Sequence, residues 1–313
     1  MNFKCKSLFL LLCVAFSCQI VAQNQVINSD VKVSGNQINF KTYTYAIKGV
    51  DTLKMDVFTP KNIKTSDSLP VLLWMHGGGF SGSHRAYPDD SNLVKYAAEK
   101  QNYIGVSIDY RLLRKNKTTG FGCDCTKDEK LETFKQAAID YLDAAKFLVE
   151  HAHKLQIDPT KIIAGGSSAG AEGMLNAVFM KDYFVKNKEV YANAKFAGVF
   201  ACAGAIVDAR YITEENAVPA VLYHGTKDNY VPYGNASHHL CDAKQPGYFR
   251  LDGSAIIIEK LEALGIAYSF NIVKGGGHEI ARIPFEDLEK VFHFFEQTML
   301  NKEVIQTKII RTK

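Results

Sequence analysis

Residues 166–170 combine residue types and spacing that suit nucleophilic chemistry. Their sequence, Gly-Ser-Ser-Ala-Gly, fits the pattern G-x-S-x-G, which places a serine on a tight turn between a strand and a helix. An apolar run (161–164) precedes the turn and a helix-forming stretch (171–180) follows it. We predict Ser168 as the nucleophile, because Ser167 has no glycine two positions after it.

Residues 76–80, His-Gly-Gly-Gly-Phe, follow another apolar run, 70–75. Successive glycines let backbone N–H groups converge on one point, where they can stabilise the oxyanion that forms when an acyl carbon is attacked. The sequence predicts that Gly78 and Gly79, with the amide of Ala169, form this oxyanion hole. A phosphate loop is the alternative, but the segment lacks the Lys-Ser/Thr ending of a nucleotide site.

A serine nucleophile needs a base, and a histidine oriented by a carboxylate can serve near neutral pH. His278 lies in a glycine-rich loop after the last apolar run, and Asp228 follows the run before it. We predict the set Ser168, Asp228 and His278, which follow one another along the chain at separations of 60 and 50 residues. Asp208 is a rival for the acid, whereas Glu279 is disfavoured because its side chain should diverge from that of His278.

The elements between these segments alternate between strand and helix patterns. Residues 39–47 and 52–58 predict an opening hairpin. Continuous apolar runs, typical of parallel strands that are buried on both faces, occupy 70–75, 103–109, 161–164, 196–202, 218–224 and 267–273. Apolar residues recur at helical spacing within 131–148 and 288–299. The pattern predicts an α/β fold with a mostly parallel central sheet of about eight strands and helices on both faces. Ligands then bind beyond the carboxyl ends of the strands, where all four segments lie.

The composition is that of a folded domain. Of the 313 residues, 47% are hydrophobic and 22% charged, which argues against disorder. The formal net charge is +4, and it becomes about +2 if residues 1–22 are removed. A charge so close to neutral gives no reason to expect nucleic acid or an anionic membrane as a partner.

The N-terminus has the layout of a secretory signal peptide. Lys4 and Lys6 precede the short apolar run 7–17, and Ala22 offers a small residue before a cleavage site. We expect residues 1–22 to be a signal peptide of a secreted or periplasmic protein, with no transmembrane segment in the mature chain. Lipid attachment at Cys18 is the alternative. A single domain should span 23–302, followed by a short, loose basic tail, 303–313.

The cysteine count is compatible with export. Four cysteines remain after the leader, namely Cys123, Cys125, Cys202 and Cys241. An even number in an exported chain permits two disulfides. We expect at least one long-range disulfide, because a bond between Cys123 and Cys125 would close a very small ring. Cys123 and Cys125 lack the ligand spacing of a zinc site, and 238–241 could equally be a solvated loop, so no metal is expected.

Together these motifs resemble those of the α/β-hydrolase superfamily, and within it the carboxylesterase and hormone-sensitive-lipase-like esterases or the feruloyl and acetylxylan esterases. The shared segments are 76–80, Asp-Tyr-Arg-Leu at 109–112, 166–170, Asp228 with Val231 and Pro232, and Gly277 with His278. The resemblance implies a serine esterase with Ser168, Asp228 and His278 as its triad and no cofactor. Ser167 and Ala171 depart from residues that are common in the family, so the subfamily stays open.

The substrate is set by loops over the strand ends, for which 113–130, 181–194 and 229–253 are candidates. The last contains Tyr230, Tyr233, Tyr248 and Phe249, which could stack on a sugar or phenolic ring. A small or polysaccharide-linked short acyl ester is the expected substrate. A serine peptidase or amidase on the same fold and a non-catalytic binding protein are the alternatives, and the oligomeric state is undetermined by sequence.

Overall fold

A computed structural model describes residues 38–313. The predicted signal peptide (1–22) and the alternative lipid-attachment residue Cys18 lie outside the described residues. All the described residues belong to one compact unit.

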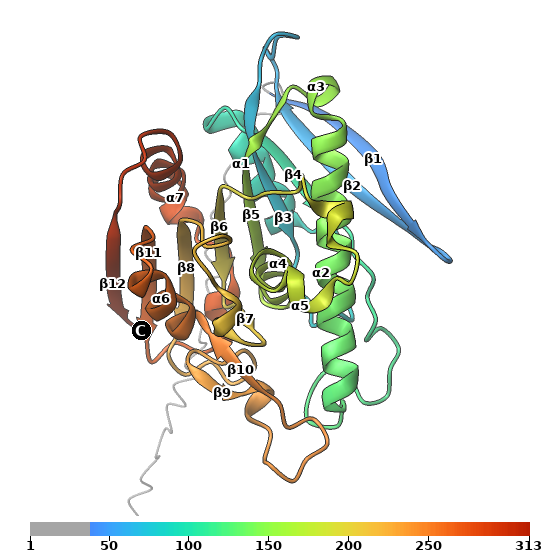
Figure 1. The fold of residues 1–313 in the computed structure, drawn as a ribbon, viewed down its shortest axis with the longest axis vertical. Helices are drawn as coiled ribbons and strands as arrows, with labels where there is room; N and C mark the ends of the chain where they lie inside the picture. The colour runs from blue at the N-terminus through green and yellow to red at the C-terminus, as the bar shows by residue number, and fades with distance from the viewer. Residues whose placement is uncertain (1–37) are drawn as a thin grey trace, which may run out of the picture. The chain divides into compact units, whose positions relative to one another are not determined.

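The centre of that unit is a sheet that, among the described residues, has nine strands in the order β1-β2-β4-β3-β5-β6-β8-β11-β12 (Figure 1). Only the pairs β1–β2 and β2–β4 are antiparallel, and every other neighbouring pair is parallel. The strands are β1 (Ile38–Lys48), β2 (Asp51–Pro60), β3 (Leu69–Met75), β4 (Ile104–Ile108), β5 (Ile157–Ser167), β6 (Gly198–Cys202), β8 (Ala220–Gly225), β11 (Tyr268–Lys274) and β12 (Gln306–Thr312). The opening hairpin and the parallel strands that the sequence predicted are therefore confirmed.

Helices cover both faces of this sheet, because its strands are apolar on both sides. The side chains of β3 alternate: Val71, Leu73 and Met75 pack in one core with α2, α4 and α6. Leu72 and Trp74 pack in a second core with α1 and α7. The helices are α1 (Pro88–Lys100), α2 (Lys127–Glu150), α3 (Ala152–Leu155), α4 (Ala169–Phe179), α5 (Lys181–Phe184), α6 (Ser254–Ala263) and α7 (Leu288–Phe295).

The start of α2 illustrates how the sequence fixes these elements. The Thr126 side chain accepts from the backbone N–H of Glu129, and the Glu129 carboxylate accepts from the N–H of Thr126. This reciprocal cap satisfies two backbone donors that the first turn of a helix leaves free. The long helix that follows ends at Glu150 and carries the predicted apolar stripe against the sheet.

A small second sheet forms over the carboxyl ends of the main strands. It consists of β7 (Ala205–Ile206), β10 (Arg250–Gly253) and β9 (Asn235–Ser237), all antiparallel. Two of these strands belong to the loop 229–253, which is therefore not an open loop. The small sheet gives that segment a fixed position beside the larger sheet.

The C-terminal tail is not loose, which corrects the sequence-based prediction. Within residues 303–313, β12 pairs with β11 in parallel over seven residues and extends the main sheet. Basic side chains that suggested a solvated tail bind acidic partners: Lys308 pairs with Glu262 at 2.7 Å and Arg311 with Asp287 at 2.6 Å. The domain thus continues past residue 302, because β11 needs a partner on its second edge.

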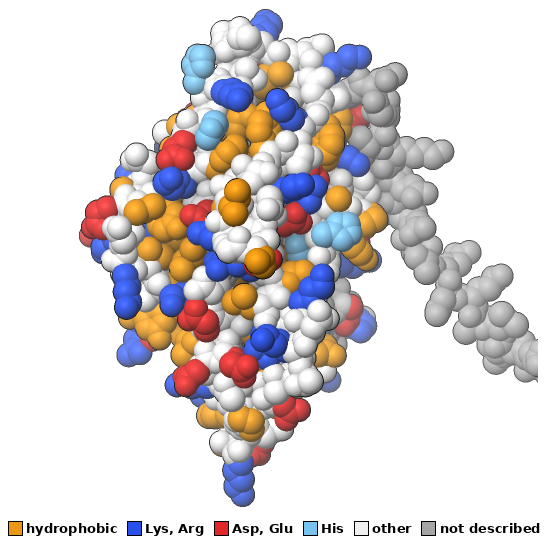
Figure 2. Space-filling view, turned by 90° about the vertical axis from the view of Figure 1, so that its right-hand side faces the viewer, with side chains coloured by type: hydrophobic (Ala, Val, Ile, Leu, Met, Phe, Trp, Pro, Cys, Tyr) orange, Lys and Arg blue, Asp and Glu red, His pale blue; other side chains and the backbone are white. Residues whose placement is uncertain are grey.

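The surface mixes charges of both signs. Figure 2 shows Lys and Arg side chains interspersed with Asp and Glu side chains on the face that it displays. Among residues 38–313, no helix combines the length and apolar character needed to span a bilayer.

Candidate active site

Ser168 lies at the sharp turn from β5 into α4. Its backbone has φ 50° and ψ −126°, a strained conformation for a residue with a side chain. The turn is as tight as the glycines imply: a Cβ added to Gly166 would lie 2.6 Å from the backbone of Gly170. A Cβ on Gly170 would lie 2.1 Å from the carbonyl oxygen of Met75. The turn therefore requires both glycines, and it raises the Ser168 side chain above the end of the sheet.

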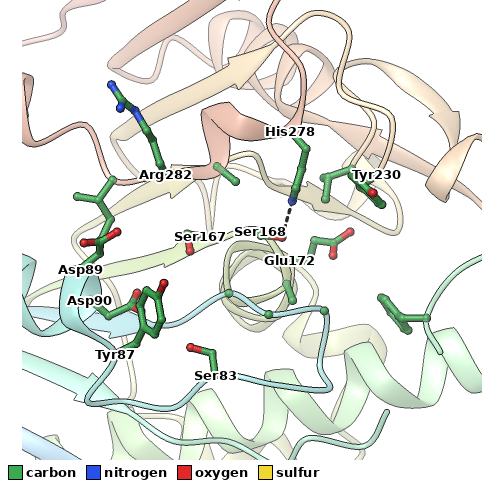
Figure 3. A pocket seen from close by; sticks show the side chains of 18 of the residues that line it. Ser83, Tyr87, Asp89, Asp90, Ser167, Ser168, Glu172, Tyr230, His278 and Arg282 are labelled. Carbon is green, nitrogen blue, oxygen red and sulfur yellow. Dashed lines mark hydrogen bonds between the residues drawn. The ribbon is translucent and has the colours of Figure 1, made fainter. Parts of the chain in front are cut away.

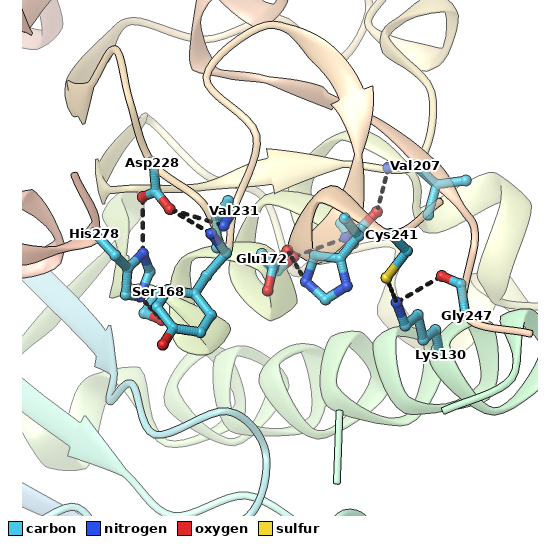
Figure 4. Close-up of polar contacts among 12 residues, drawn as sticks. Lys130, Ser168, Glu172, Val207, Asp228, Val231, Cys241, Gly247 and His278 are labelled. Atoms are coloured by element: carbon cyan, nitrogen blue, oxygen red, sulfur yellow. Dashed lines mark hydrogen bonds and ion pairs between the residues drawn. The ribbon is translucent and has the colours of Figure 1, made fainter. Parts of the chain in front are cut away.

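The structure brings Ser168, His278 and Asp228 together from three different strand ends (Figure 4). The Ser168 hydroxyl and Nε2 of His278 are 2.8 Å apart. Nδ1 of the same ring lies 2.8 Å from Oδ2 of Asp228. Since Nδ1 faces a carboxylate, it carries a proton, and Nε2 is left free to accept the serine proton.

Asp228 is buried, and every contact it makes favours its charged form. Its Oδ1 accepts from the backbone N–H groups of Tyr230 and Val231, at 2.9 and 3.0 Å. Its Oδ2 lies 2.8 Å from His278 and 3.5 Å from Nε2 of His224. Burial alone would raise the pKa of Asp228, but contacts with these two imidazoles hold that pKa well below its usual range.

The glycine loop after β3 faces the same point. Gly78 and Gly79 have φ values of 112° and 61°, which residues with side chains rarely adopt. Among the described residues, the amides of Gly78, Gly79 and Ala169 donate to no other backbone group. The hydroxyl of Tyr110 donates to the carbonyl of His76 at 3.0 Å and thus holds the start of the loop.

A pocket of about 590 Å³ surrounds these groups. Figure 3 shows two groups of side chains on either side of Ser168. On one side lie Ser83, Tyr87, Asp89, Asp90 and Arg282. Glu172 and Tyr230 lie on the other side, and His238, His239 and Phe121 also line the pocket.

Comparisons with known proteins address the fold and the family. A protein-family model described as BD-FAE matches residues 55–208, just under half of the chain. The match includes Gly78, Gly79 and Ser168 but ends before Asp228 and His278.

Two curated relatives illustrate the similarity. A secreted triacylglycerol lipase of Gibberella zeae is 28% identical over 171 residues, which are 53% of this chain and 27% of the lipase. Gut esterase 1 of Caenorhabditis briggsae is 37% identical over 128 residues, which are 39% of this chain and 20% of the esterase. The matched segments thus span about a quarter of the length of the lipase and a fifth of the length of the esterase.

Solved structures extend the similarity to most of the chain. The apo form of esterase 2 of Thermogutta terrifontis superposes with a TM-score of 0.61 at 16% identity, covering 86% of this chain and 96% of its own. This chain has the α/β-hydrolase fold, and segments of it are similar to lipases and carboxylesterases. The fold class and the family resemblance expected from the sequence are confirmed.

The rival acids have other partners in this α/β-hydrolase. Asp208 caps a short helix at Ala209–Tyr211 and pairs with Arg210 at 2.5 Å. Glu279 accepts from the N–H of Gly277 and from the ammonium of Lys313, which lowers the pKa of that carboxyl to about 2. Both carboxylates therefore hold structural contacts, while Asp228 alone of the three bonds to His278.

Sequence reasoning missed several buried polar groups of the candidate site. His224 is fully buried beside Asp228, with its Nδ1 2.7 Å from the hydroxyl of Ser254. Glu172 and His238 line the pocket and are also buried. A signal for Glu172 does exist in the sequence: it is the only charged residue in α4, and a helix that is apolar all round is buried.

The loop 229–253 contributes fewer aromatic side chains to the pocket than the sequence suggested. Tyr230 lines the pocket, is 48% exposed, and has its ring 5.1 Å from that of His278. Tyr233 stacks on Phe270, and Phe249 is buried. Neither is a pocket-lining residue.

One disulfide joins two of the substrate loops. It links Cys123 with Cys241, 118 residues apart, and confirms the expectation of at least one long-range bond. Cys125 and Cys202 are buried free thiols. Between residues 38 and 313, no group of three or more His, Cys, Asp or Glu side chains is arranged to hold a metal ion.

Proposed function

We propose that this protein is a serine carboxylic-ester hydrolase that forms an acyl-enzyme on Ser168. The observation that carries the proposal is the hydrogen-bonded series from the Ser168 hydroxyl through His278 to Asp228, with 2.8 Å at both steps. The amides of Gly78, Gly79 and Ala169 complete the proposed site.

The reaction follows from these positions. Oγ of Ser168 attacks the ester carbonyl while Nε2 of His278 takes its proton, and the carbonyl oxygen becomes an oxyanion beside the three amides. The tetrahedral intermediate collapses, the alkoxide leaves with the proton from His278, and the acyl group remains on Ser168. Water, deprotonated by His278, then releases the acid and restores the serine.

Asp228 and His224 have supporting roles in this scheme. The Asp228 carboxylate keeps the proton of His278 on Nδ1 and stabilises the imidazolium that forms during attack. His224 contacts the other side of Oδ2 at 3.5 Å and acts only through Asp228, so we propose it as a positioning residue.

The two ends of the pocket differ in ways that suit different parts of an ester substrate. At one end Tyr87 and Asp89 are exposed, whereas at the other end Glu172 and His238 are buried beneath the more exposed Tyr230. A carbohydrate polymer fits best at the end with Tyr87 and Asp89, where carboxylates and a tyrosine ring suit sugar hydroxyls. The leaving alcohol therefore belongs at the exposed end and the acyl group at the buried end, so we propose short acyl esters of carbohydrate or aromatic alcohols as substrates.

The buried end also limits the acyl length. Each methylene that enters an apolar channel contributes about 0.8 kcal/mol, but here the channel meets two polar side chains. We expect kcat/KM on p-nitrophenyl esters to stop rising after butyrate and to fall at octanoate and palmitate. A maximum at octanoate or beyond would contradict the short-acyl proposal.

A fluorophosphonate probe tests the nucleophile. Wild type and Ser167→Ala should both become labelled, whereas Ser168→Ala should not. Hydrolysis of p-nitrophenyl acetate should fall by several orders of magnitude in Ser168→Ala with the fold intact. Labelling that persists in Ser168→Ala but disappears in Ser167→Ala would show that Ser167, and not Ser168, is the nucleophile. Cleavage of peptides but of no ester would favour a peptidase.

We also propose that the protein is exported. Residues 1–22 support this through their basic start and apolar run, and one similar lipase is described as secreted. N-terminal sequencing of the mature protein should begin at Gln23. If the mature protein instead began at a lipid-modified Cys18, it would be attached to a membrane by that lipid.

A further inference from the structure

The buried end of the pocket holds a carboxyl group and an imidazole that face one another without forming a hydrogen bond. Oε1 of Glu172 and Nε2 of His238 are 3.4 Å apart. The residues are 1% and 0% exposed, and both line the pocket. Glu172, labelled in Figure 4, lies in α4, one helical turn beyond Ser168.

Among the described residues, these atoms have no hydrogen-bond partner. Oε1 of Glu172 and both ring nitrogens of His238 are buried and unsatisfied. Buried polar groups are satisfied in the great majority of cases, so an exception beside a pocket calls for a partner that the protein itself does not supply. The rings of Phe121 and Phe134 pack against the imidazole, with centroids 5.0 and 5.9 Å away, and so hold its position.

Both groups are neutral near pH 7. Burial is the main cause that raises the pKa of Glu172 to about 8; His278 opposes this rise and the charge of Asp228 contributes to it. Burial lowers the pKa of His238 well below its usual value, and the ammonium of Lys130 acts in the same direction. Each group then offers one donor and at least one acceptor, which a single hydroxyl group can match from both sides.

We propose that Glu172 and His238 bind a hydroxyl group on the acyl part of the substrate, so that the enzyme prefers hydroxyacyl esters. The inference rests on the proposed ester hydrolysis. Glu172 follows Ser168 by four residues, a distance of about 6 Å along a helix. Because the Glu172 side chain shortens the remaining gap, a hydroxyl on the third or fourth carbon of an acyl chain held at Ser168 is the position that we expect to reach it. An unsubstituted acyl chain leaves both polar groups unsatisfied.

The experiment compares matched esters that differ by one oxygen. The p-nitrophenyl esters of butyrate and of 3- and 4-hydroxybutyrate share their leaving group and chain length. In wild type, kcat/KM should be roughly 10- to 100-fold higher for the better hydroxy ester, because binding the hydroxyl satisfies groups that butyrate leaves unpaired. Equal values for butyrate and both hydroxy esters would overturn the inference.

Variants assign the preference to the two side chains. Glu172→Leu and His238→Phe should each reduce the ratio to within about threefold, since each removes one partner of the hydroxyl. Glu172→Gln should keep most of it, because an amide still donates and accepts. If folded Glu172→Leu or His238→Phe kept the full preference for the hydroxy ester, the proposal would be contradicted. Loss of that preference in folded Glu172→Gln would contradict it as well.

A matched control lies elsewhere in the chain. Glu99 in α1 also has two buried carboxylate oxygens without hydrogen-bond partners, but it is not among the pocket-lining residues. Glu99→Leu should leave the ratio unchanged. The failures are distinguishable: wild type inactive on all three esters would reject ester hydrolysis itself, whereas an active enzyme without preference would reject only the hydroxyl site.

Discussion

The Asp228 carboxylate lies between two imidazole rings, and this arrangement makes it more than an anchor for His278. Each of its oxygens is occupied, one by two backbone N–H groups and the other by His278 and His224. These contacts favour the charged carboxylate and hold its pKa well below the usual range. The orientation of His278 is thus fixed before substrate binds.

The first prediction concerns this carboxylate. Asp228→Asn should lower kcat by about 10⁴-fold, because an amide can no longer accept the Nδ1 proton and favours the wrong tautomer. Asp208→Asn should stay near wild type, since Asp208 bonds to Arg210. Initial rates on p-nitrophenyl acetate, with circular dichroism to verify folding, measure both. The opposite ranking would transfer the acid role to Asp208.

A second prediction concerns Glu172 and alkaline pH. Its pKa of about 8 means that the carboxyl is neutral below pH 8 and ionises above it. The new charge lies near Asp228, His278, Lys130, His224 and His238, and it opposes an oxyanion at Ser168. Activity should therefore fall above about pH 8, and Glu172→Gln should remain active there.

The free energy of unfolding should also depend on the titration of Glu172, at pH values below its folded pKa. A carboxyl whose folded pKa is raised binds more protons in the folded state, so its contribution to the free energy of unfolding decreases as pH rises from about 4.5 to 8. Glu172→Gln removes this loss and should raise Tm relative to wild type at pH 8 but much less at pH 5. Parallel pH profiles of wild type and the variant would show that Glu172 does not titrate.

At the scale of elements, the buried wall of the pocket depends on two loops that are fastened together. The disulfide joins Cys123 in one loop to Cys241 in the other. Beside it, the buried ammonium of Lys130 donates to the carbonyl of Gly247 at 2.7 Å. His238 and His239 lie just before Cys241, so the same fastening fixes their position.

Removal of the disulfide should accordingly affect both stability and specificity. Cys123→Ser with Cys241→Ser should lower the free energy of unfolding by about 2 to 4 kcal/mol. It should also weaken any preference among acyl groups, because the wall loses a constraint. Denaturant unfolding with and without reductant measures the first effect. Reductant should destabilise wild type and leave the double variant unchanged; equal sensitivity of both proteins would place the effect elsewhere.

Some elements could be predicted from the sequence and others could not, for physical reasons. Strands such as β3 are continuous apolar runs because both faces are buried, so their signal is local. β12 has the sequence Gln-Thr-Lys-Ile-Ile-Arg-Thr, and its edge position lets it remain polar. Its pairing depends on β11 and on acids in other elements, which no local pattern records.

The site divides in the same way. Ser168, Gly78 and Gly79 were predictable because tight turns demand glycine at fixed spacing. His278 and Asp228 followed from their place after strands. The pair of Glu172 and His238 is defined only by the packing of α4 against a loop about 65 residues away, so its role could not be predicted before the fold was known.

For the whole molecule, the two ends of the sheet are finished differently. At one end the antiparallel hairpin of β1 and β2 adds to β4. At the other end β12 covers β11; Lys308 and Arg311 of β12 pair with Glu262 and Asp287, and Lys313, which follows the strand, pairs with Glu279. Asp287 is buried, so its pairing with Arg311 also compensates a charge inside the domain.

Truncation after Lys302 tests whether this last strand belongs to the domain. Loss of β12 exposes the edge of β11 over seven residues and leaves Asp287 with Lys290 as its only cationic partner among the described residues. We expect Tm to fall by at least about 5 °C and aggregation to increase, because an uncovered strand edge can pair with other chains. Arg311→Ala is the matched variant: it keeps the strand and removes only the ion pair, so it should show a smaller fall without aggregation. If the truncated protein kept its Tm within about 1 °C of wild type, β12 would contribute no stability and the domain would end near residue 302 after all.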